Sequence, residues 1–132
     1  MSEHSRKLIE AFAQSHDPQH FAEDAVYTQM VPSQSFNGRA AIAGMLQLFY
    51  KEAFSDARGE LRNVATDTEK DIGFIEFTFR GRHTGAFLGI PATGRLVEVP
   101  MLGAYEIGGG KIQRARLYYD MATLMRQLGQ IA

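Results

Sequence analysis

The chain has 132 residues, of which 45% are hydrophobic, so we expect one globular domain over residues 1–132. Its 14 basic and 15 acidic residues give a net charge of -1, and the signs alternate along the chain, which argues against a nucleic-acid partner. The sequence contains no cysteine, which excludes disulfides and thiolate chemistry. The polar N-terminal stretch and the lack of a long apolar run argue against a signal peptide and a membrane segment, and predict a cytoplasmic protein.

The N-terminal half predicts helices around one strand. Residues 2–14 carry apolar side chains at helical spacing, which indicates an amphipathic helix. Asp17 and Pro18 suit the N-cap and first residue of a short second helix over residues 19–23, and a strand follows near residues 25–30. The main core helix begins after a glycine at position 38, and its predicted buried face consists of Ile42, Met45, Leu46, Phe49 and Ala53.

The C-terminal half alternates between polar and apolar residues, which is typical of strands. The predicted strands cover residues 60–67, 71–83, 96–107 and 111–119. Polar and glycine-rich turns between them favour an antiparallel meander. A closing helix over residues 121–128 is expected to end at Gly129. This order of elements predicts an α+β domain with helices on one face of a curved antiparallel sheet.

Residues 84–95 fit neither the helical nor the strand period and predict a long structured loop. Glycines flank its apolar side chains and could hinge it as a lid over a pocket mouth. A fixed loop packed against the sheet or a partner subunit is the alternative.

His83 is a first candidate for chemistry. In the strand over residues 71–83 it lies at the end of the apolar face, where it would border a cavity left open by the helices. The alternative is a histidine held by a backbone carbonyl in the core, or one exposed at the strand end.

Asp120 is a second candidate, because it stands between the last strand and the last helix. An aspartate at that place is a favoured N-cap, whose pKa amide hydrogen bonds would lower. A carboxylate in an apolar pocket would instead have a raised pKa and could transfer protons. Spacing alone leaves both interpretations open.

Other patterns argue against a metal or a nucleotide. His16 and His20 have the spacing of a helical metal pair, but Pro18 lies between them, so we expect no metal site. The three glycines at positions 108–110 lack the context of a phosphate loop and fit a hairpin turn.

Several motifs of the sequence resemble those of one protein family and occur in the same order along the chain. They are GRHTGAFLGIPATGRLVEVP, then YEIGGGKI, then YYDMATLMRQLG, with FNGRAAI resembling the start of the family's core helix. The chain resembles the SnoaL-like polyketide cyclases of the nuclear-transport-factor-two-like, or cystatin-like, superfamily, which also contains the ketosteroid isomerases. The resemblance implies a cone-shaped domain, in which a curved, partly mixed sheet wraps around three to four helices and an internal pocket.

The resemblance also implies cofactor-free acid/base chemistry on a hydrophobic, carbonyl-bearing small molecule, by aldol ring closure or isomerisation. Asp120 would be the general base and His83 would orient or polarise a carbonyl. The candidate substrate-binding residues are Tyr27, Phe49, Phe77, Phe79, Met101, Tyr105, Arg116 and Tyr118. No cofactor is expected. A non-catalytic binding or structural module of the same fold is the alternative.

The chain departs from its relatives at two places, and the resemblance also suggests a homodimer. Arg116 stands where many relatives have tryptophan, and an arginine there could hold Asp120 ionised. The positions matching part of the epoxide hydrolase triad are Gly81 and His83, which makes that activity the least expected. Members of the superfamily commonly form homodimers through their sheets, and the polar face of the strand over residues 71–83 would supply such an interface.

Overall fold

The computed structural model describes residues 2–131. In chain order the elements are α1 (Ser2–Ser15), a 3-10 turn η1 (Pro18–His20), β1 (Phe21–Met30), β2 (Ser33–Asn37), α2 (Arg39–Gln47), a π-helical turn η2 (Leu48–Glu52), β3 (Phe54–Asp67), β4 (Ile72–His83), β5 (Leu96–Gly108), β6 (Lys111–Tyr119) and α3 (Met121–Gln127). Among these described residues, no helix is long and apolar enough to cross a membrane.

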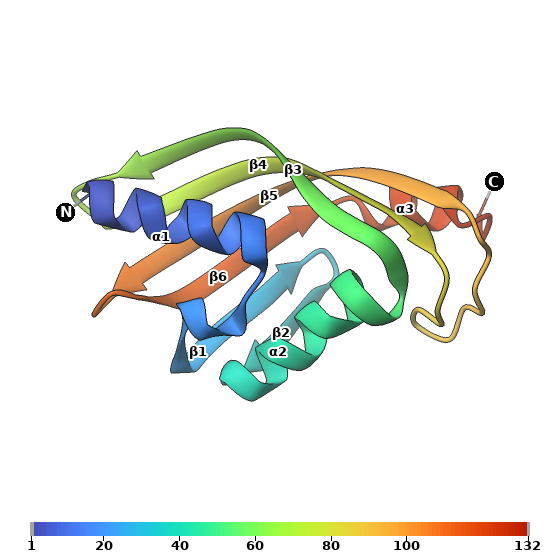
Figure 1. Ribbon diagram of the computed structural model, residues 1–132, viewed down its shortest axis with the longest axis horizontal. Helices are drawn as coiled ribbons and strands as arrows, with labels where there is room; N and C mark the ends of the chain where they lie inside the picture. Colours follow the sequence, from blue (N-terminus) through green and yellow to red (C-terminus); the bar gives the residue numbers. More distant parts are fainter. Residues whose placement is uncertain (1, 132) are drawn as a thin grey trace.

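The strands form one curved sheet in the order β2-β1-β6-β5-β4-β3 (Figure 1). Neighbouring strands are antiparallel except β1 and β6, which are parallel, so the sheet is mixed. The predicted α+β class and the antiparallel meander of the last four strands are confirmed. The parallel pair places a strand from the start of the chain beside one from its end.

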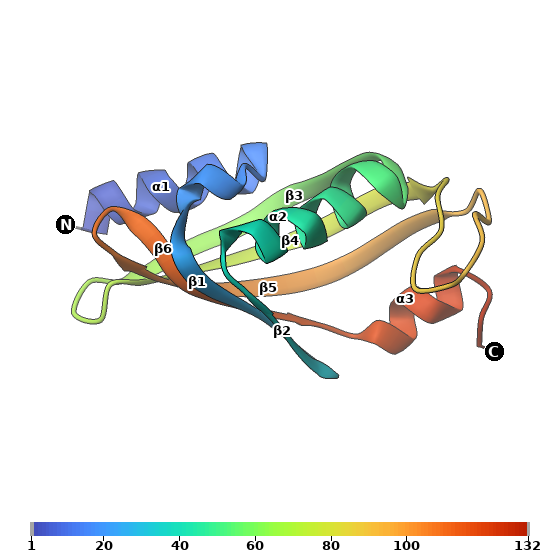
Figure 2. The same cartoon turned by 90° about the horizontal axis from the view of Figure 1, so that it is seen from below.

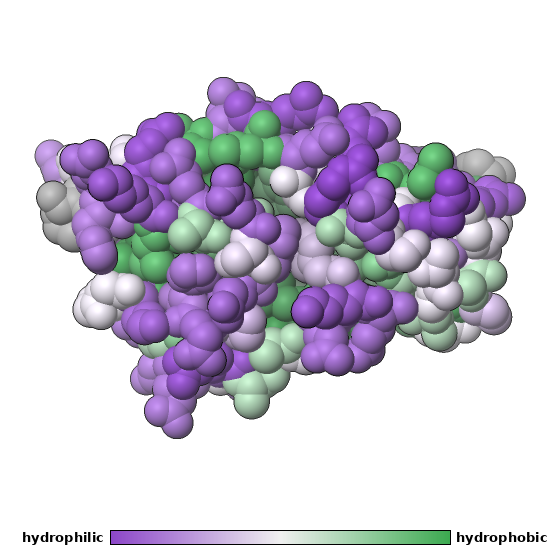
Figure 3. All heavy atoms as spheres, viewed as in Figure 1, coloured by the Kyte–Doolittle hydropathy of each residue, from purple (hydrophilic) through white to green (hydrophobic). Residues whose placement is uncertain are grey.

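Helices α1 and α2 cover one face of the sheet, and α3 lies at the far end of the molecule beside the C-terminus (Figures 1 and 2). The apolar face predicted for the core helix is buried, with Ile42 and Ala53 fully enclosed. The face of the molecule in Figure 3 is mostly hydrophilic, with small apolar areas between the polar side chains. The core therefore lies between the two helices and the concave side of the sheet.

The structure differs from the sequence prediction at three places. The short helix expected over residues 19–23 is only the turn η1, because Phe21 is completely buried as the first residue of β1. Strand β2 was not predicted, since its sequence SQSFN is polar and mostly exposed. Strand β3 begins at Phe54 rather than at residue 60, because Phe54 pairs with His83.

The loop over residues 84–95 is fixed at several points. The backbone amides of Thr84 and Gly85 both donate to the carbonyl of Ala53, each at 3.0 Å. The ring of Phe87 is buried and packs 5.2 Å from the ring of Phe49. These contacts fit the packed-loop alternative, and residues 84–95 do not border the internal cavity described below.

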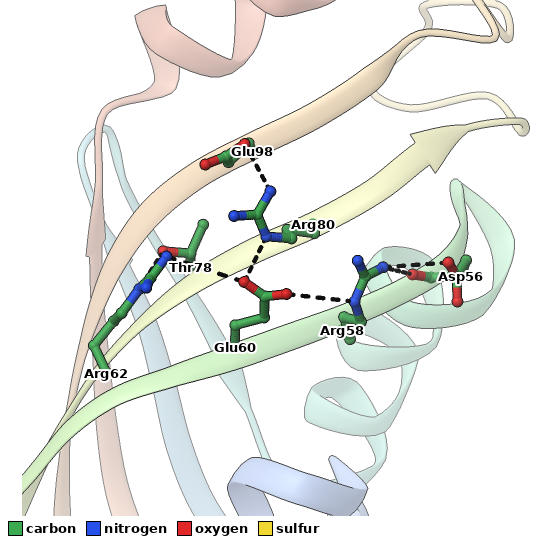
Figure 4. A network of polar contacts seen from close by, with 7 residues as sticks. All are labelled: Asp56, Arg58, Glu60, Arg62, Thr78, Arg80 and Glu98. Carbon is green, nitrogen blue, oxygen red and sulfur yellow. Dashed lines mark hydrogen bonds and ion pairs between the residues drawn. The ribbon is translucent and has the colours of Figure 1, made fainter.

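The outer face of the sheet carries a network of charged side chains (Figure 4). Arg80 bridges two strands, because its Nε lies 2.6 Å from Glu60 of β3 and its Nη1 lies 2.6 Å from Glu98 of β5. Such solvent-exposed ion pairs add little stability. Beside the network this face also exposes the apolar side chains of Phe74, Leu96, Leu102 and Tyr118.

Candidate active site

An internal cavity lies between α1, the α2–η2 segment and the concave face of the sheet. It is lined by Phe12, Ala13, His16, Tyr27, Met45, Leu46, Phe49, Tyr50, Gly59, Leu61, Ile75, Phe77, Phe79, Met101, Tyr105 and Leu117. Its volume is about 30 Å³, which is room for roughly one or two water molecules. Leu61, a half-exposed residue of the edge strand β3, is the most accessible part of the lining. A larger ligand therefore requires the lining to move apart.

His16 borders this cavity at the end of α1. Its φ of 53° is left-handed, and its backbone amide donates to the carbonyl of Phe12 at 2.7 Å, which ends the helix. The imidazole stacks on the ring of Tyr50, with centroids 3.7 Å apart and planes 17° apart. Burial lowers its pKa to about 4, so the ring is neutral at pH 7.

Space beside His16 is kept open by a glycine. A Cβ atom at Gly59 would lie 3.7 Å from His16 Nε2 and 3.1 Å from the ring of Phe77. Neither ring nitrogen of His16 has a hydrogen-bond partner among residues 2–131. The imidazole is therefore free to bond to a molecule in the cavity.

Three tyrosines with phenol hydroxyls line the same cavity, namely Tyr27, Tyr50 and Tyr105. Within the described part of the chain, none of these hydroxyls has a hydrogen-bond partner. Burial raises the pKa of all three, and the pKa of Tyr27 is raised further by the neighbouring phenols. They are therefore neutral donors at any physiological pH.

Tyr105 is placed by a second glycine. A Cβ atom at Gly103 would clash with the Tyr105 hydroxyl and lie 2.6 Å from two of its ring carbons. The ring lies across Gly103, its neighbour on the same face of β5, because that position has no side chain. Any larger residue would displace the phenol from the cavity.

Most of the predicted substrate-binding residues do line the cavity. These are Tyr27, Phe49, Phe77, Phe79, Met101 and Tyr105. Arg116 and Tyr118 do not line it, and their contact to a substrate stays a prediction. In β6 the side chains of Ala115, Leu117 and Tyr119 face inward, so the alternate residues face outward. Arg116 there forms an ion pair with Glu106 at 2.5 Å and is not bonded to Asp120.

Asp120 is exposed and caps α3. Its carboxylate accepts hydrogen bonds from the amide of Ala122 at 3.1 Å and from the hydroxyl of Thr123 at 2.9 Å. It is not among the residues that line the cavity. This geometry fits the cap interpretation, and the role of Asp120 as a general base stays a prediction.

His83 is completely buried at the end of the apolar face of β4, as its phase predicts. The amide of Thr93 donates to its Nδ1 at 3.1 Å, so the proton of the neutral ring is on Nε2. Nε2 has no hydrogen-bond partner and the ring lies 5.5 Å from that of Phe54. His83 does not line the cavity either, and its contact to a substrate stays a prediction.

Two features of the cavity were missed by sequence reasoning. The sequence pattern singles out His16 only as a possible metal ligand, although it lies four residues after Phe12 and seven after Ile9, on a continuation of the buried face of α1. Extending that helical face by one turn would have found it. Tyr50 reaches the cavity through the π-helical turn, for which the sequence carries no clear signal. Among residues 2–131 there is no group of three or more metal-binding side chains.

The enclosed apolar cavity under a curved mixed sheet defines a class, the cone-shaped α+β domains with a ketosteroid isomerase-like fold. The family model of the SnoaL-like polyketide cyclases matches residues 4–128. The chain belongs to this family. Among curated proteins, by contrast, no match is found.

Solved structures share the fold over nearly the whole chain. A Jannaschia sp. CCS1 protein, provisionally described as a SnoaL-like polyketide cyclase, is 15% identical with a TM-score of 0.86, and the match covers 98% of this chain and 94% of that one. A provisionally described polyketide cyclase from Xanthomonas campestris is 22% identical with a TM-score of 0.76, over 96% and 97% of the two chains. A Catenulispora acidiphila protein with a ketosteroid isomerase-like fold, solved with trimethylamine, is 20% identical with a TM-score of 0.76, over 95% and 94%.

Proposed function

We propose that the protein binds a hydrophobic, carbonyl-bearing small molecule in the internal cavity and catalyses cofactor-free proton transfer next to that carbonyl. The observation that carries this proposal is the set of three phenol hydroxyls, unpaired among residues 2–131, in a cavity whose lining is apolar apart from them and His16. Unpaired polar groups in such a place are costly unless a ligand or a water molecule bonds to them. Membership of the SnoaL-like cyclases supports the same class of chemistry.

The phenols suit the stabilisation of an enolate. Removing a proton next to a carbonyl leaves negative charge on the carbonyl oxygen, and neutral donors in a dry cavity stabilise that charge strongly. The raised pKa values of Tyr27 and Tyr105 keep their protons in place while they donate. The resulting enolate can attack a second carbonyl, which closes a ring, or take a proton at another carbon, which isomerises the molecule.

A binding module without turnover is the second candidate. The placement of Asp120 and His83 outside the cavity favours it, because these are the residues that the family resemblance implies for proton transfer. The two candidates differ in whether the bound molecule exchanges protons.

The experiment follows the carbon-bound protons of 2-tetralone, a bicyclic ketone, by proton NMR in deuterated buffer with and without the protein. We expect the protein to accelerate their exchange. Tyr27→Phe and Tyr105→Phe should each reduce the acceleration by about 10-fold to 1000-fold. Tyr118→Phe, which changes a tyrosine on the outer face, is the matched control and should leave it unchanged.

Asp120→Asn in the same assay distinguishes the two interpretations of Asp120, helix cap and general base. If Asp120 only caps α3, the variant keeps the exchange rate, because asparagine caps as well as aspartate. A large loss in the folded variant would instead support Asp120 as the base. Saturable binding of 2-tetralone without faster exchange would favour the binding module.

We also propose that two copies pair through the outer face of the sheet. Support comes from the apolar side chains exposed there among balanced charges, which is a composition suited to a self-complementary contact.

A further inference from the structure

We propose that His16 is the catalytic base of this site, accepting the proton next to the substrate carbonyl and returning it to the product. The inference rests on the proposed function, because it assigns the proton carrier that the tyrosines cannot supply. It does not depend on Asp120 or His83.

The lining of the cavity contains one side chain suited to accept a proton, the imidazole of His16. Apart from His16 and the three phenols, every lining residue is glycine or has an alkyl, aryl or thioether side chain. A neutral phenol is a very weak base, and burial strongly disfavours its anion. His16 is thus the lining residue that is neutral at pH 7 and offers a nitrogen lone pair able to accept a proton from a bound substrate.

The position of the imidazole is fixed by contacts on several sides. Tyr50 stacks on one face at 3.7 Å, and Phe12 meets it edge-on with centroids 5.8 Å apart. The left-handed backbone at the end of α1 turns this ring over the cavity. Nε2 faces the side-chain-free Gly59, so a substrate edge can approach a nitrogen that has no bond to break first.

His16 also connects the cavity with solvent. It borders two surface grooves, one shared with Asp17, Tyr50 and Lys51, and one shared with Arg58 and Gly59. These, together with His20 across the ring of Phe12, are the titratable and charged groups that face it. A proton held on the imidazole can therefore exchange with water between turnovers.

The step balances without a co-reactant. The C–H bond next to the carbonyl breaks, its proton moves to a ring nitrogen of His16, and its electron pair forms the enolate held by the phenols. The enolate carbon then attacks a second carbonyl of the same molecule, and the imidazolium protonates the new alkoxide. In an isomerisation the imidazolium protonates another carbon instead.

The test compares His16→Asn with His20→Asn in the 2-tetralone exchange assay. Asparagine tolerates the left-handed backbone at position 16 and removes the basic ring. His20 also packs edge-on against Phe12, at 6.3 Å, but does not line the cavity, so it is the matched control. We expect His16→Asn to reduce the acceleration by about 100-fold or more, and His20→Asn to keep it within about twofold of the unchanged protein. Both variants should bind 2-naphthol, an enol-shaped analogue, with nearly unchanged affinity.

The outcomes separate the two claims. Exchange that is fast in the unchanged protein and equally fast in folded His16→Asn overturns the role of His16 and leaves the proposed function standing. No acceleration by the unchanged protein overturns the proposed function, and the catalytic role of His16 with it. A second readout is the set of nitrogen chemical shifts of the His16 ring, measured by NMR with and without 2-naphthol. A merely structural ring would not respond to 2-naphthol, so unchanged chemical shifts would contradict direct contact.

Discussion

The burial of a neutral imidazole at position 16 links stability to pH. Its pKa is lowered to about 4 in the folded chain, against 6.5 for an unperturbed histidine. Between these values the unfolded chain binds a proton that the folded chain does not, so the stability contributed by the neutral ring is complete above pH 6.5 and decreases as the pH falls towards 4. The loss reaches at most about 3 kcal/mol.

Urea unfolding at a series of pH values between 4 and 7.5 tests this expectation. The free energy of unfolding should fall more steeply with acid in the unchanged protein than in His16→Asn, since the variant lacks the titrating ring. Subtracting the two curves removes the contribution of all carboxylates. Parallel curves would contradict a buried, neutral His16.

The candidate site could be predicted only in part at the level of single residues. Phe77, Phe79 and Met101 follow from strand alternation, because every second side chain of β4 and β5 faces the concave side. The same rule could not orient β6, where both phases contain large side chains. The conformation of His16 depends on where α1 ends, and helix ends are the least predictable feature of a helix.

Among the secondary-structure elements, α3 is held to the sheet by the side chain of Gln127, which bonds to β5 where a neighbouring strand would otherwise do so. In the described part of the chain, no strand continues beyond Tyr119 beside the first half of β5, and Gln127 takes that place. Its Oε1 accepts from the amide of Glu98 at 2.7 Å and its Nε2 donates to the carbonyl of the same residue at 2.8 Å. The amide thus copies both hydrogen bonds of an antiparallel neighbour.

Gln127→Ala is therefore expected to destabilise the protein by roughly 1 to 2 kcal/mol, since two backbone groups lose their partner but can reach water. Gln130→Ala is the control, because among residues 2–131 the Gln130 side chain bonds only to the nearby carbonyl of Leu128. Urea denaturation of both variants provides the comparison. Equal, negligible effects would show that α3 is held by Leu124 and Leu128 alone.

The element predictions succeeded where a long periodic pattern was present. The core helix and the last four strands carry such patterns. The short strand β2 does not, and its pairing with β1 depends on a hairpin whose polar residues carry little strand propensity. The switch from α2 into the π-helical turn is likewise a packing effect, because it places Phe49 and Tyr50 between the helix and the sheet.

At the scale of the whole molecule, pairing through the outer face of the sheet predicts a dimer. Leu102 and Tyr118 lie opposite each other on β5 and β6 and are 41% and 40% exposed. Leu102→Lys should shift the protein towards a monomer, because it brings a like charge from each copy into the proposed two-fold contact. Leu88→Lys, on the exposed loop, is the control.

Light scattering at micromolar concentration measures the mass of each form. We expect a dimer for the unchanged protein and for Leu88→Lys, and a monomer for Leu102→Lys. A monomeric unchanged protein would remove this proposal, while the internal cavity and its chemistry would be unaffected.

The parallel pairing of β1 with β6 also determines the order in which the protein can fold during synthesis. Strand β1 leaves the ribosome early, but its inner neighbour β6 is almost the last segment to emerge. Until then the hairpin of β1 and β2 has an unpaired edge and no sheet to join. The β3–β4–β5 meander can assemble first, and β6 then joins the two parts. Nascent chains halted before β6 should therefore hold a formed meander beside an N-terminal segment that chaperones still recognise.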